Sequence, residues 1–587
     1  MRSDLLTLAE RTDFQQTGRT DEVDRLCAAM QAEWPDAVRS LEFGRSAEGR
    51  PMRALIVSRT GALDPRELQE RRVPVLMLQA GIHPGESDGK DAGFIALREL
   101  LSANTRADPL ERQAVLFVPA FNTDGHERVG PWNRPNQNGP QITGWRATAQ
   151  NLNLNRDYAK ADAPEMRALL VLVTSFDPLI CADLHVTDGA DFEPDISLQV
   201  EPINQGDPKL HASARELRGR LIERLARQGS LPLAFYPDFA ETDNPASGFV
   251  LSVYSPRFST GYFPQRNRFT VLVETHSWKP YARRVQITVN TIMGLAELTA
   301  ERGGAWLAEV RAADGAACAL GGSKLILDYR SSWREPTAAG KESAAASGEA
   351  DTRGEADADA ERIDFRGYAY TREPSDISGA QVTVYDPGTP QIWRVPYRSR
   401  IEPTLAAQAP RQGYIVPRAY ADEIVPRLKC HGITVEPAPS SLEQLEQFRA
   451  RRVAFSSQPF EGRMRATLSG AWETLHREIA ARPLFVPIAQ PLARLIVALL
   501  EPEAPDSFAA WGFFNACFEQ KEHLEPYVAE QIARSVLAAD PKLRHAFDAR
   551  LAQDAAFRAD PVARLEFFCR HHPSWDERLN CYPIYRV

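Results

Sequence analysis

The chain has 587 residues, of which 43% are hydrophobic and 25% are charged, and this composition is ordinary for globular proteins. The length exceeds what a single hydrophobic core supports, so two or three domains are expected. The net charge of −9 disfavours nucleic acid as a partner, because no long basic stripe is available to neutralise phosphates.

No apolar run reaches the roughly 18 residues that a membrane helix needs, so no membrane span is expected. The N-terminus, Met1-Arg2-Ser3-Asp4-Leu5-Leu6, lacks the apolar core of a signal peptide. The chain as supplied therefore predicts a cytoplasmic protein; a periplasmic or secreted location stays open if an export signal was removed. The seven cysteines contain no Cys-x-x-Cys pair, which favours reduced thiols over disulfides or a cysteine-held metal.

Apolar runs alternate with amphipathic stretches between about residues 20 and 300, the pattern of an α/β domain with a largely buried sheet. Strands are predicted at 53–58, 73–80, 114–120, 178–184 and 269–274. Helices are predicted at 88–103, which has one apolar face, and at 164–176. The second helix begins with Pro164, and proline is well tolerated in the first helical turn.

The composition changes sharply at residues 336–362, which contain no large apolar residue. Such a segment cannot bury enough surface to offset its ordering entropy, so we predict a flexible low-complexity insertion. Beyond it, 381–385 is strand-like, whereas 441–453 and 524–539 are predicted helices. The chain therefore divides into an α/β domain at 1–310, the insertion at 336–362, and an α+β accessory region at 363–587 whose role the sequence does not indicate.

The first candidate site follows the predicted strand 73–80, where Gly81 is succeeded by Ile82 and His83-Pro84-Gly85-Glu86. Imidazole nitrogen and carboxylate oxygen are common zinc ligands, and open α/β sheets place active sites at the carboxyl ends of their strands. Of the 11 histidines, His83 alone has a glutamate at the third following position. By itself the pair also suits a loop histidine beside a helix-capping acid.

A third ligand candidate, His185, follows the predicted strand 178–184 in Ala182-Asp183-Leu184-His185. Taken alone, it is more typical of a hydrogen-bonded loop histidine than of a metal ligand. Together with His83 and Glu86 it makes a His₂Glu set, which is a known catalytic zinc arrangement with the fourth position open to water.

A carboxylate stands at the end of another predicted strand, where Phe269-Thr270-Val271-Leu272-Val273 leads into Glu274. Hydrolysis at a metal needs a base that takes a proton from water, and Glu274 is the candidate for that task. His276 is a rival metal ligand, because two-residue alternation would keep it on the same side of an extended chain as Glu274.

Arginine and asparagine residues between these motifs are candidates for substrate binding. They are Arg146 in Gly144-Trp145-Arg146 and the pair Asn155-Arg156 in a run that alternates asparagine with leucine. The guanidinium fork matches a carboxylate with two hydrogen bonds, and an arginine near a metal loop can stabilise an oxyanion. The alternative for any single arginine is a solvated surface charge.

These motifs, in this order, resemble those of the zinc carboxypeptidase family M14 over roughly residues 50–285. The residues that carry the resemblance are His83-Pro84-Gly85-Glu86, Asn122-Thr123-Asp124-Gly125, Arg146, Asn155-Arg156, Asp183-Leu184-His185 and Glu274. The resemblance implies an α/β/α sandwich around a mixed, mostly eight-stranded sheet.

The resemblance also implies a metal site and its base. One zinc ion would be held by His83, Glu86 and His185, while Glu274 would act as general base and later as proton donor. The expected cofactor is therefore one Zn²⁺ per chain.

The same resemblance implies how a substrate is held. Arg146 would polarise the scissile carbonyl, and Asn155 and Arg156 would bind the C-terminal carboxylate of a peptide. The expected function is thus a zinc-dependent carboxypeptidase that hydrolyses the C-terminal peptide bond. The alternatives are a deacylase or amidase of the same metal fold, acting on an N-acyl amino acid or a cell-wall peptide, and a non-catalytic binding module.

The chain departs from the family's pattern at some positions. Asn153 stands where members often carry an aspartate that orients a zinc-binding histidine, and an amide cannot raise ligand basicity as a carboxylate does. Tyr254 and Tyr262 are both candidates for the family's mobile active-site tyrosine. Arg257, between them, hints at a preference for an acidic substrate side chain, although a surface role suits it better.

Overall fold

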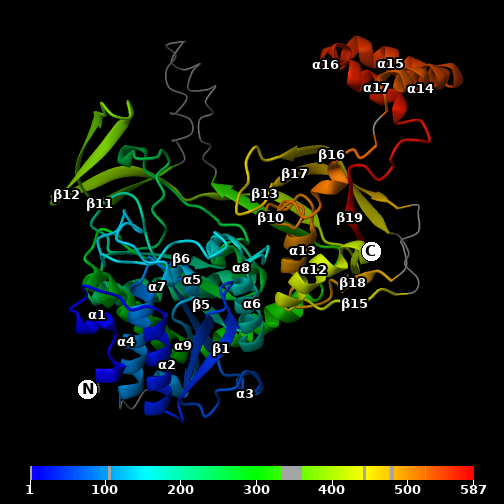
Figure 1. The fold of residues 1–587 in the computed structure, drawn as a ribbon. Coiled ribbons are helices and arrows are strands. Elements are labelled where there is room, and N and C mark those ends of the chain that lie inside the picture. Colours follow the sequence, from blue (N-terminus) through cyan, green and yellow to red (C-terminus); the bar gives the residue numbers. More distant parts are fainter. Residues whose placement is uncertain (1–2, 104–107, 332–359, 440–444, 476–481, 523) are drawn as a thin grey trace.

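An eight-stranded mixed sheet organises the first half of the chain, as a computed structural model of residues 3–103, 108–331, 360–439, 445–475, 482–522 and 524–587 shows (Figure 1). Its order from edge to edge is β1-β2-β4-β3-β5-β9-β6-β7. The strands are β1 (Val38–Arg45), β2 (Pro51–Ser58), β3 (Val75–Ala80), β4 (Ala114–Val118), β5 (Ile180–Val186), β6 (Ile196–Glu201), β7 (Pro232–Leu233) and β9 (Phe269–Thr275). All five predicted strands are present.

The centre of the sheet is parallel, because β4, β3, β5 and β9 run in one direction. Antiparallel pairs flank it at β1–β2, β2–β4 and β6–β9. Every residue of β3, β4 and β5 is buried, which explains why these strands read as continuous apolar runs. The carboxyl ends of β3, β5 and β9 consequently open at one edge of the sheet.

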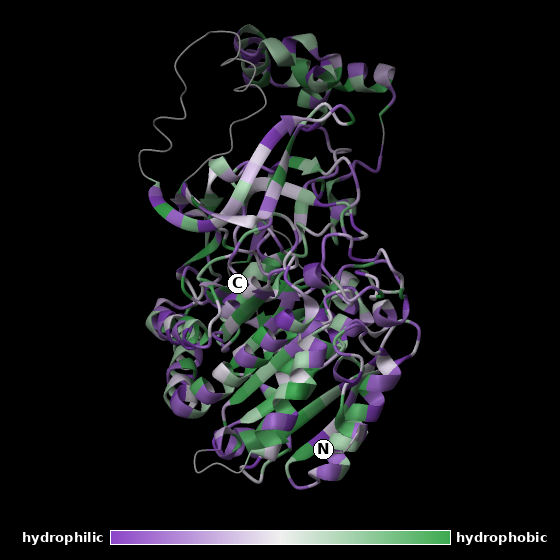
Figure 2. Ribbon diagram, turned by 90° about the vertical axis from the view of Figure 1, so that its left-hand side faces the viewer, coloured by the Kyte–Doolittle hydropathy of each residue, from purple (hydrophilic) through white to green (hydrophobic). Residues whose placement is uncertain are grey.

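Helices cover both faces of the sheet and bury separate apolar clusters against it (Figures 1 and 2). One face carries α2 (Thr20–Glu33), α4 (Asp88–Ser102), α7 (His211–Arg227) and α9 (Tyr281–Ala317). The other face carries α3 (Pro65–Glu70), α6 (Pro164–Phe176) and α8 (Ser259–Gln265). The expected α/β/α sandwich around a mixed eight-stranded sheet is therefore confirmed, as are the helices predicted at 88–103 and 164–176.

Short helices occupy several connections in this part of the chain. They are the α-helices α1 (Leu8–Arg11) and α5 (Thr123–Glu127) and the 3₁₀ helices Ser3–Leu5, Pro109–Glu111, Leu154–Arg156, Pro208–Leu210 and Pro245–Ser247. Leu154–Arg156 carries the predicted substrate clamp, so the alternating asparagine and leucine run forms a helical turn in place of a strand.

The C-terminal region contributes three further β-structures. They are a pair, β10 (Lys324–Ser331) with β13 (Ile401–Gln408); a hairpin, β11 (Glu361–Pro374) with β12 (Gln381–Arg398), which pairs with β8 (Phe249–Val250); and an antiparallel six-stranded sheet. The six strands are β14 (Gly413–Val416), β15 (Glu436–Pro437), β16 (Glu446–Phe455), β17 (Ala466–Thr474), β18 (Leu484–Pro487) and β19 (Cys581–Arg586).

The C-terminal helices fall into two groups. The first group packs toward the N-terminal sheet and comprises α12 (Arg418–Cys430), α13 (Ala493–Leu500) and the 3₁₀ helix Asn515–Phe518. The second projects away from the rest of the molecule and comprises α14 (Pro526–Ala539), α15 (Pro541–Gln553), α16 (Ala555–Ala559) and α17 (Pro561–Cys569) (Figure 1). The helix predicted at 524–539 is therefore confirmed.

The helix predicted at 441–453 is wrong where the structure describes it, because residues from Glu446 onward form β16. This strand buries Phe448 and Ala450 and pairs with both β17 and β19. Pairing on two sides decides its conformation, since strand preference depends strongly on tertiary neighbours.

The predicted division into domains stays a prediction. Helix α9 runs through the proposed boundary at residue 310 to Ala317. The predicted insertion at 336–362 lies outside the described residues as far as 359, and β11 begins at Glu361.

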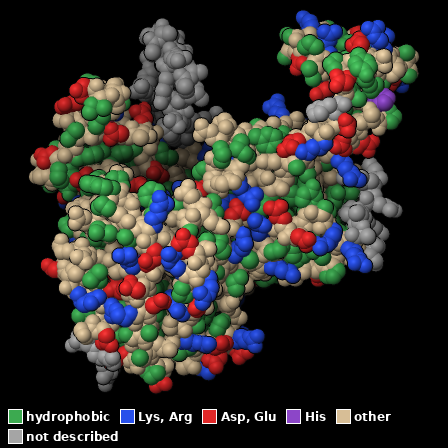
Figure 3. Space-filling model, in the orientation of Figure 1, with side chains coloured by type: hydrophobic (Ala, Val, Ile, Leu, Met, Phe, Trp, Pro, Cys, Tyr) green, Lys and Arg blue, Asp and Glu red, His purple; other side chains and the backbone are tan. Residues whose placement is uncertain are grey.

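Two observations describe the helices and the surface. None of the helices in the described part of the chain is long and apolar enough to traverse a bilayer. Acidic and basic side chains are intermixed over the face shown in Figure 3.

Candidate active site

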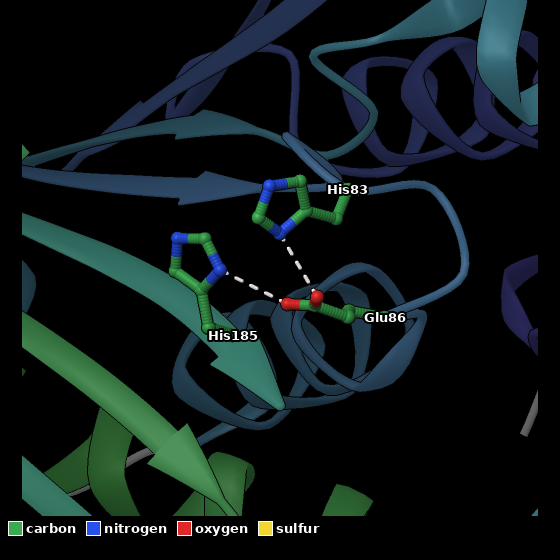
Figure 4. A group of neighbouring side chains, drawn as sticks. All are labelled: His83, Glu86 and His185. Carbon is green, nitrogen blue, oxygen red and sulfur yellow. Dashed lines mark hydrogen bonds and ion pairs between the residues drawn. The ribbon is translucent and has the colours of Figure 1, made fainter. Parts of the chain in front are cut away.

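The three predicted metal ligands meet at the open edge of the sheet (Figure 4). The Nδ1 atom of His83 lies 2.9 Å from Oε1 of Glu86, and the Nδ1 atom of His185 lies 2.9 Å from Oε2 of the same carboxylate. All three side chains are buried, and their ligand atoms lie within 4.8 Å of one another. A sharp turn aims His83 here: Gly81 has a φ of +67°, and a Cβ at this position would lie 2.8 Å from the ring of His126.

The outer ring nitrogens of both histidines have polar neighbours. Nε2 of His83 lies 3.1 Å from Oδ1 of Asn153, and Nε2 of His185 lies 3.1 Å from Oδ1 of Asp183. When both rings are neutral, a hydrogen on each Nε2 leaves the Nδ1 lone pairs facing Glu86, which is the tautomer that metal ligation requires. The donor set, its convergence and its tautomer all fit a zinc ion.

Burial and neighbouring charges set the protonation of this group. Burial lowers the pKa of His83 to about 4, so the ring is neutral near pH 7. Burial also works against protonation of His185, but Asp183 and Glu86 raise its pKa well above the ordinary value. Burial alone would raise the pKa of Glu86, yet the charge of Arg134 and the hydrogen bonds from the imidazoles of His185 and His83 hold it well below its usual range. The carboxylate is therefore ionised.

Glu274 lies beside the metal group because β9 pairs in register with β5, which sets Glu274 opposite His185. Burial raises the pKa of Glu274 to about 8, and the like charges of Glu86 and Asp188 act in the same direction. Its Oε2 atom is buried and has no hydrogen-bond partner in the described part of the chain. A buried carboxyl group with a strongly shifted pKa in a cavity is a candidate for proton transfer.

His276, the rival ligand, does not join the metal group. The strand ends at Thr275, so the predicted alternation stops before His276. Its ring stacks on Phe192 at 4.1 Å between centroids, and its Nε2 atom lies 3.2 Å from Asp191.

A cavity of about 380 Å³ brings the remaining candidates to the metal group. Its walls include His83, Glu86, Arg146, Asn155, Arg156, His185, Asp188, Tyr236, Asp238, Tyr254, Phe258 and Glu274. The seven residues to which the family resemblance assigned metal binding, proton transfer or substrate binding therefore all line one cavity. Arg146 lies 3.7 Å from Oε1 of Glu86 and is 37% exposed.

The predicted carboxylate clamp has unused binding capacity. Arg156 lies 4.3 Å from the ring centre of Phe258, and no carboxylate of the described residues lies within ion-pair distance of it. Burial and the like charge of Arg146 lower the pKa of Arg156 to about 10, so it stays cationic near pH 7. The Oδ1 atom of Asn155 is buried without a partner among the described residues. An anion in the cavity would satisfy the arginine.

The two candidate tyrosines occupy different places, and only Tyr254 lines the cavity. Tyr254 lines the cavity, and its hydroxyl donates to Oδ2 of Asp238 at 3.2 Å. Tyr262 is fully buried elsewhere, with its hydroxyl 2.9 Å from Nδ1 of His431. Arg257 turns to Asp506 of the C-terminal region, so the structure does not bring it to the cavity wall.

Several residues at the site escaped the sequence analysis. Arg134 contacts Oε1 of Glu86 at 3.1 Å, and Asp188, Tyr236 and Asp238 line the cavity from loops that carry no motif. Asp183, by contrast, stands in the motif Asp183-Leu184-His185, and a residue two positions before a strand ligand lies on the same face of the strand.

Two side chains of the C-terminal region form hydrogen bonds with N-terminal loops that line the cavity. Oε2 of Glu461 accepts the backbone N–H of Asn153 at 2.8 Å, next to the clamp. Oδ2 of Asp506 accepts the backbone N–H of Arg257 at 2.8 Å, in the loop that carries Tyr254. Residues far along the chain thus fix the position of two loops that line the cavity.

The sequence matches known proteins over the segment that bears most of these motifs. The zinc carboxypeptidase family (peptidase M14) matches residues 23–189. Carboxypeptidase 2 of Trichophyton tonsurans is 30% identical over 155 residues, which make up 26% of this chain and 25% of that protein. Carboxypeptidase 2 of Trichophyton rubrum is 29% identical over 155 residues, with the same coverage. The chain therefore spans about a quarter of the length of these relatives.

Solved structures with partial similarity include carboxypeptidase A from Helicoverpa armigera, at 17% identity and a TM-score of 0.36, covering 51% of this chain and 75% of that one. A metallo-carboxypeptidase from Pseudomonas aeruginosa in complex with (2-guanidinoethylmercapto)succinic acid has 17% identity and a TM-score of 0.37, covering 50% and 69%.

The matched segment contains His83, Glu86, Arg146, the Asn155-Arg156 pair and His185, whereas Glu274 follows it and reaches the cavity through strand pairing. Residues 23–189 therefore match the zinc carboxypeptidase family M14, the family that the order of the motifs predicted.

Proposed function

We propose that the protein is a zinc-dependent carboxypeptidase that removes the C-terminal residue of a peptide. The observation that carries this proposal is the composition of one cavity. It combines a His₂Glu donor group, the buried carboxyl of Glu274 and the clamp residues Asn155 and Arg156, which lack an acidic partner among the described residues.

The proposed roles follow from the chemistry of each side chain. Asn155 and Arg156 bind the C-terminal carboxylate of the substrate, which places the last peptide bond beside Glu274. Arg146 donates to the carbonyl oxygen of that bond as negative charge develops on it. Glu274 takes a proton from the attacking water and delivers it to the leaving amine nitrogen.

The metal would be held by His83, Glu86 and His185. When bound, zinc supplies a Lewis acid that polarises the carbonyl and lowers the pKa of water. Asp183 and Asn153 hold the imidazole rings of its ligands from the outer side.

Metal analysis and a matched peptide pair test the proposal. The purified protein should contain about one zinc per chain and should release an amino acid from a peptide with a free C-terminus, but not from its C-terminal amide. A chelator should abolish release, and added zinc should restore it. Equal cleavage of the free and amidated peptides would favour a deacylase or amidase, and the absence of both metal and release would overturn the proposal.

Arg156→Gln tests the clamp. Loss of a charge-assisted contact to the carboxylate should raise KM roughly tenfold or more. Arg418→Gln, at an exposed ion pair on α12, is the control and should leave KM unchanged.

A further inference from the structure

A second cavity of about 810 Å³ adjoins the proposed catalytic cavity, and the two share Asp188, Tyr236 and Asp238 as lining residues. Three segments enclose it: residues 187–192 after β5, residues 236–243, and residues 383–387 of β12. The shared residues place the two cavities side by side, so a molecule bound beside Glu274 lies next to this space.

The outer wall belongs to the β11–β12 hairpin and is fixed to the N-terminal part of the chain. Strand β12 pairs with β8 at Tyr397 and Phe249. Thr383 donates its backbone N–H to Oδ2 of Asp243 at 2.8 Å, and Lys279 donates to the hydroxyl of Tyr368 at 3.0 Å. These contacts fix the hairpin in position as one wall of the second cavity.

The second cavity is lined by acidic side chains without basic ones among the described residues. Among the described residues its lining includes the four aspartates Asp188, Asp191, Asp238 and Asp243, and no lysine or arginine. In the described part of the chain none of the four forms an ion pair with a lysine or arginine; Asp191 faces His276, whose pKa is lowered by burial. These carboxylates are left with no cation from the described chain.

Aromatic rings accompany the aspartates. They are Phe192, Tyr236, Phe239, Trp278 and Tyr385. Carboxylates beside aromatic faces suit ammonium and guanidinium groups, which gain both ion-pair and cation–π attraction. The adjoining clamp, by contrast, presents arginines, so the two cavities suit opposite charges.

We infer that the second cavity binds the part of a peptide substrate that precedes the scissile bond, and that it favours lysine or arginine there. The inference rests on the proposed carboxypeptidase function. With the chain end held by Asn155 and Arg156 in the first cavity, the preceding residues of the peptide lie toward the second cavity, which adjoins it at Asp188, Tyr236 and Asp238.

Paired peptides test the inference. Two peptides carry identical last two residues and differ in having two lysines or two glutamates immediately before them. The lysine peptide should be hydrolysed with a kcat/KM at least about tenfold higher, and the ratio should fall as salt is raised.

A charge placed in the wall should reverse this preference. Val384 lines the second cavity and is 59% exposed, so Val384→Lys should fold and should lower the lysine-to-glutamate ratio to about one or below. Ile377→Lys is the matched control: it adds the same charge to the segment joining the hairpin's strands, at a residue that is 94% exposed and lies off the cavity lining, and should leave the ratio unchanged. Val384→Gln separates charge from shape.

The outcomes distinguish this inference from the proposed function. Release of amino acids without a preference between the peptides, or an equal loss of preference in both lysine variants, overturns the inference and leaves the carboxypeptidase standing. If no peptide is hydrolysed, calorimetric titration of both peptides into the protein still decides the matter: tighter binding of the lysine peptide, lost in Val384→Lys, supports the cavity, and equal binding refutes it.

Discussion

The N-terminal sheet and the C-terminal region both bury ionisable side chains, but they differ in whether the example considered has a partner of opposite charge. In the C-terminal region, buried Glu501 is paired with Arg586 at 2.9 Å and accepts a hydrogen bond from Tyr414. At the edge of the N-terminal sheet, Glu274 and Arg156 are buried or half-buried without an opposite charge within ion-pair distance among the described residues. A buried ionisable group without a partner is costly, and burial shifts the pKa of both Glu274 and Arg156 toward the neutral form. Their presence in one cavity indicates a binding task, whereas a paired charge indicates structural support.

The two regions are nevertheless coupled. One apolar cluster contains Met77 and Leu116 of the first sheet together with Ile424 of α12 and Leu495 of α13. Polar contacts from Glu461 and Asp506 reach the loops of the cavity. The C-terminal region therefore supports the loops that line the cavity, and substitutions in either region should change substrate binding.

The largest effect is expected from Glu274→Gln, which removes the proposed base while keeping the shape of the side chain. Hydrolysis should fall about 10³-fold, because a positioned general base contributes on the order of 10²–10⁴. Zinc content, measured by elemental analysis, should stay at the wild-type level. Loss of metal with the activity would make Glu274 a structural residue; Glu223→Gln, in an exposed ion pair, is the control.

Asp506→Asn tests the support given by the other region. Asp506 is fully buried and faces both Arg257 and Arg465, so neutralising it leaves two partly buried cations without their carboxylate. The free energy of unfolding should fall by about 3 kcal/mol, and KM should rise because the Tyr254 loop loses its anchor. Asp422→Asn, at a carboxylate 86% exposed, should change stability by less than about 1 kcal/mol. Equal effects of both variants would contradict the proposed anchoring.

Acid should weaken the contact between the regions through His431. Burial lowers the pKa of this histidine to about 3, against an ordinary value near 6.5, so the folded protein keeps it neutral. The unfolded chain therefore binds its proton first, and stability is lost as pH falls from about 6.5 toward 3; the loss at pH 5 is about 2 kcal/mol. Denaturant unfolding at pH 7 and pH 5 should show a smaller acid loss in His431→Gln than in the wild type. An unchanged pH dependence would exclude this role.

Glu461→Gln should give the smallest effect of the four. The amide can still accept the backbone N–H of Asn153, but it loses the charge assistance, which is worth about 1 kcal/mol. KM should rise several-fold with kcat nearly unchanged, because the loop carries the clamp and not the base. A fall in kcat with unchanged KM would show that the contact serves the catalytic step instead.

The sequence alone determined where the chemistry lies along the chain. Strands buried on both faces read as apolar runs, so a polar residue at or just after the end of such a run lies at the edge of the sheet. This reasoning located His83, Glu86, His185 and Glu274, and the structure brings all four to one cavity.

The tertiary structure decided which strands and loops lie next to one another. The pairing of β5 with β9 set Glu274 opposite His185, the end of β9 removed His276 from the metal group, and Tyr254 was separated from Tyr262. The anchoring contacts of Glu461 and Asp506, and the acidic wall beside the β11–β12 hairpin, join residues more than 100 positions apart. Such contacts leave no local pattern in the sequence, because strand pairing and loop packing depend on which distant surfaces fit together.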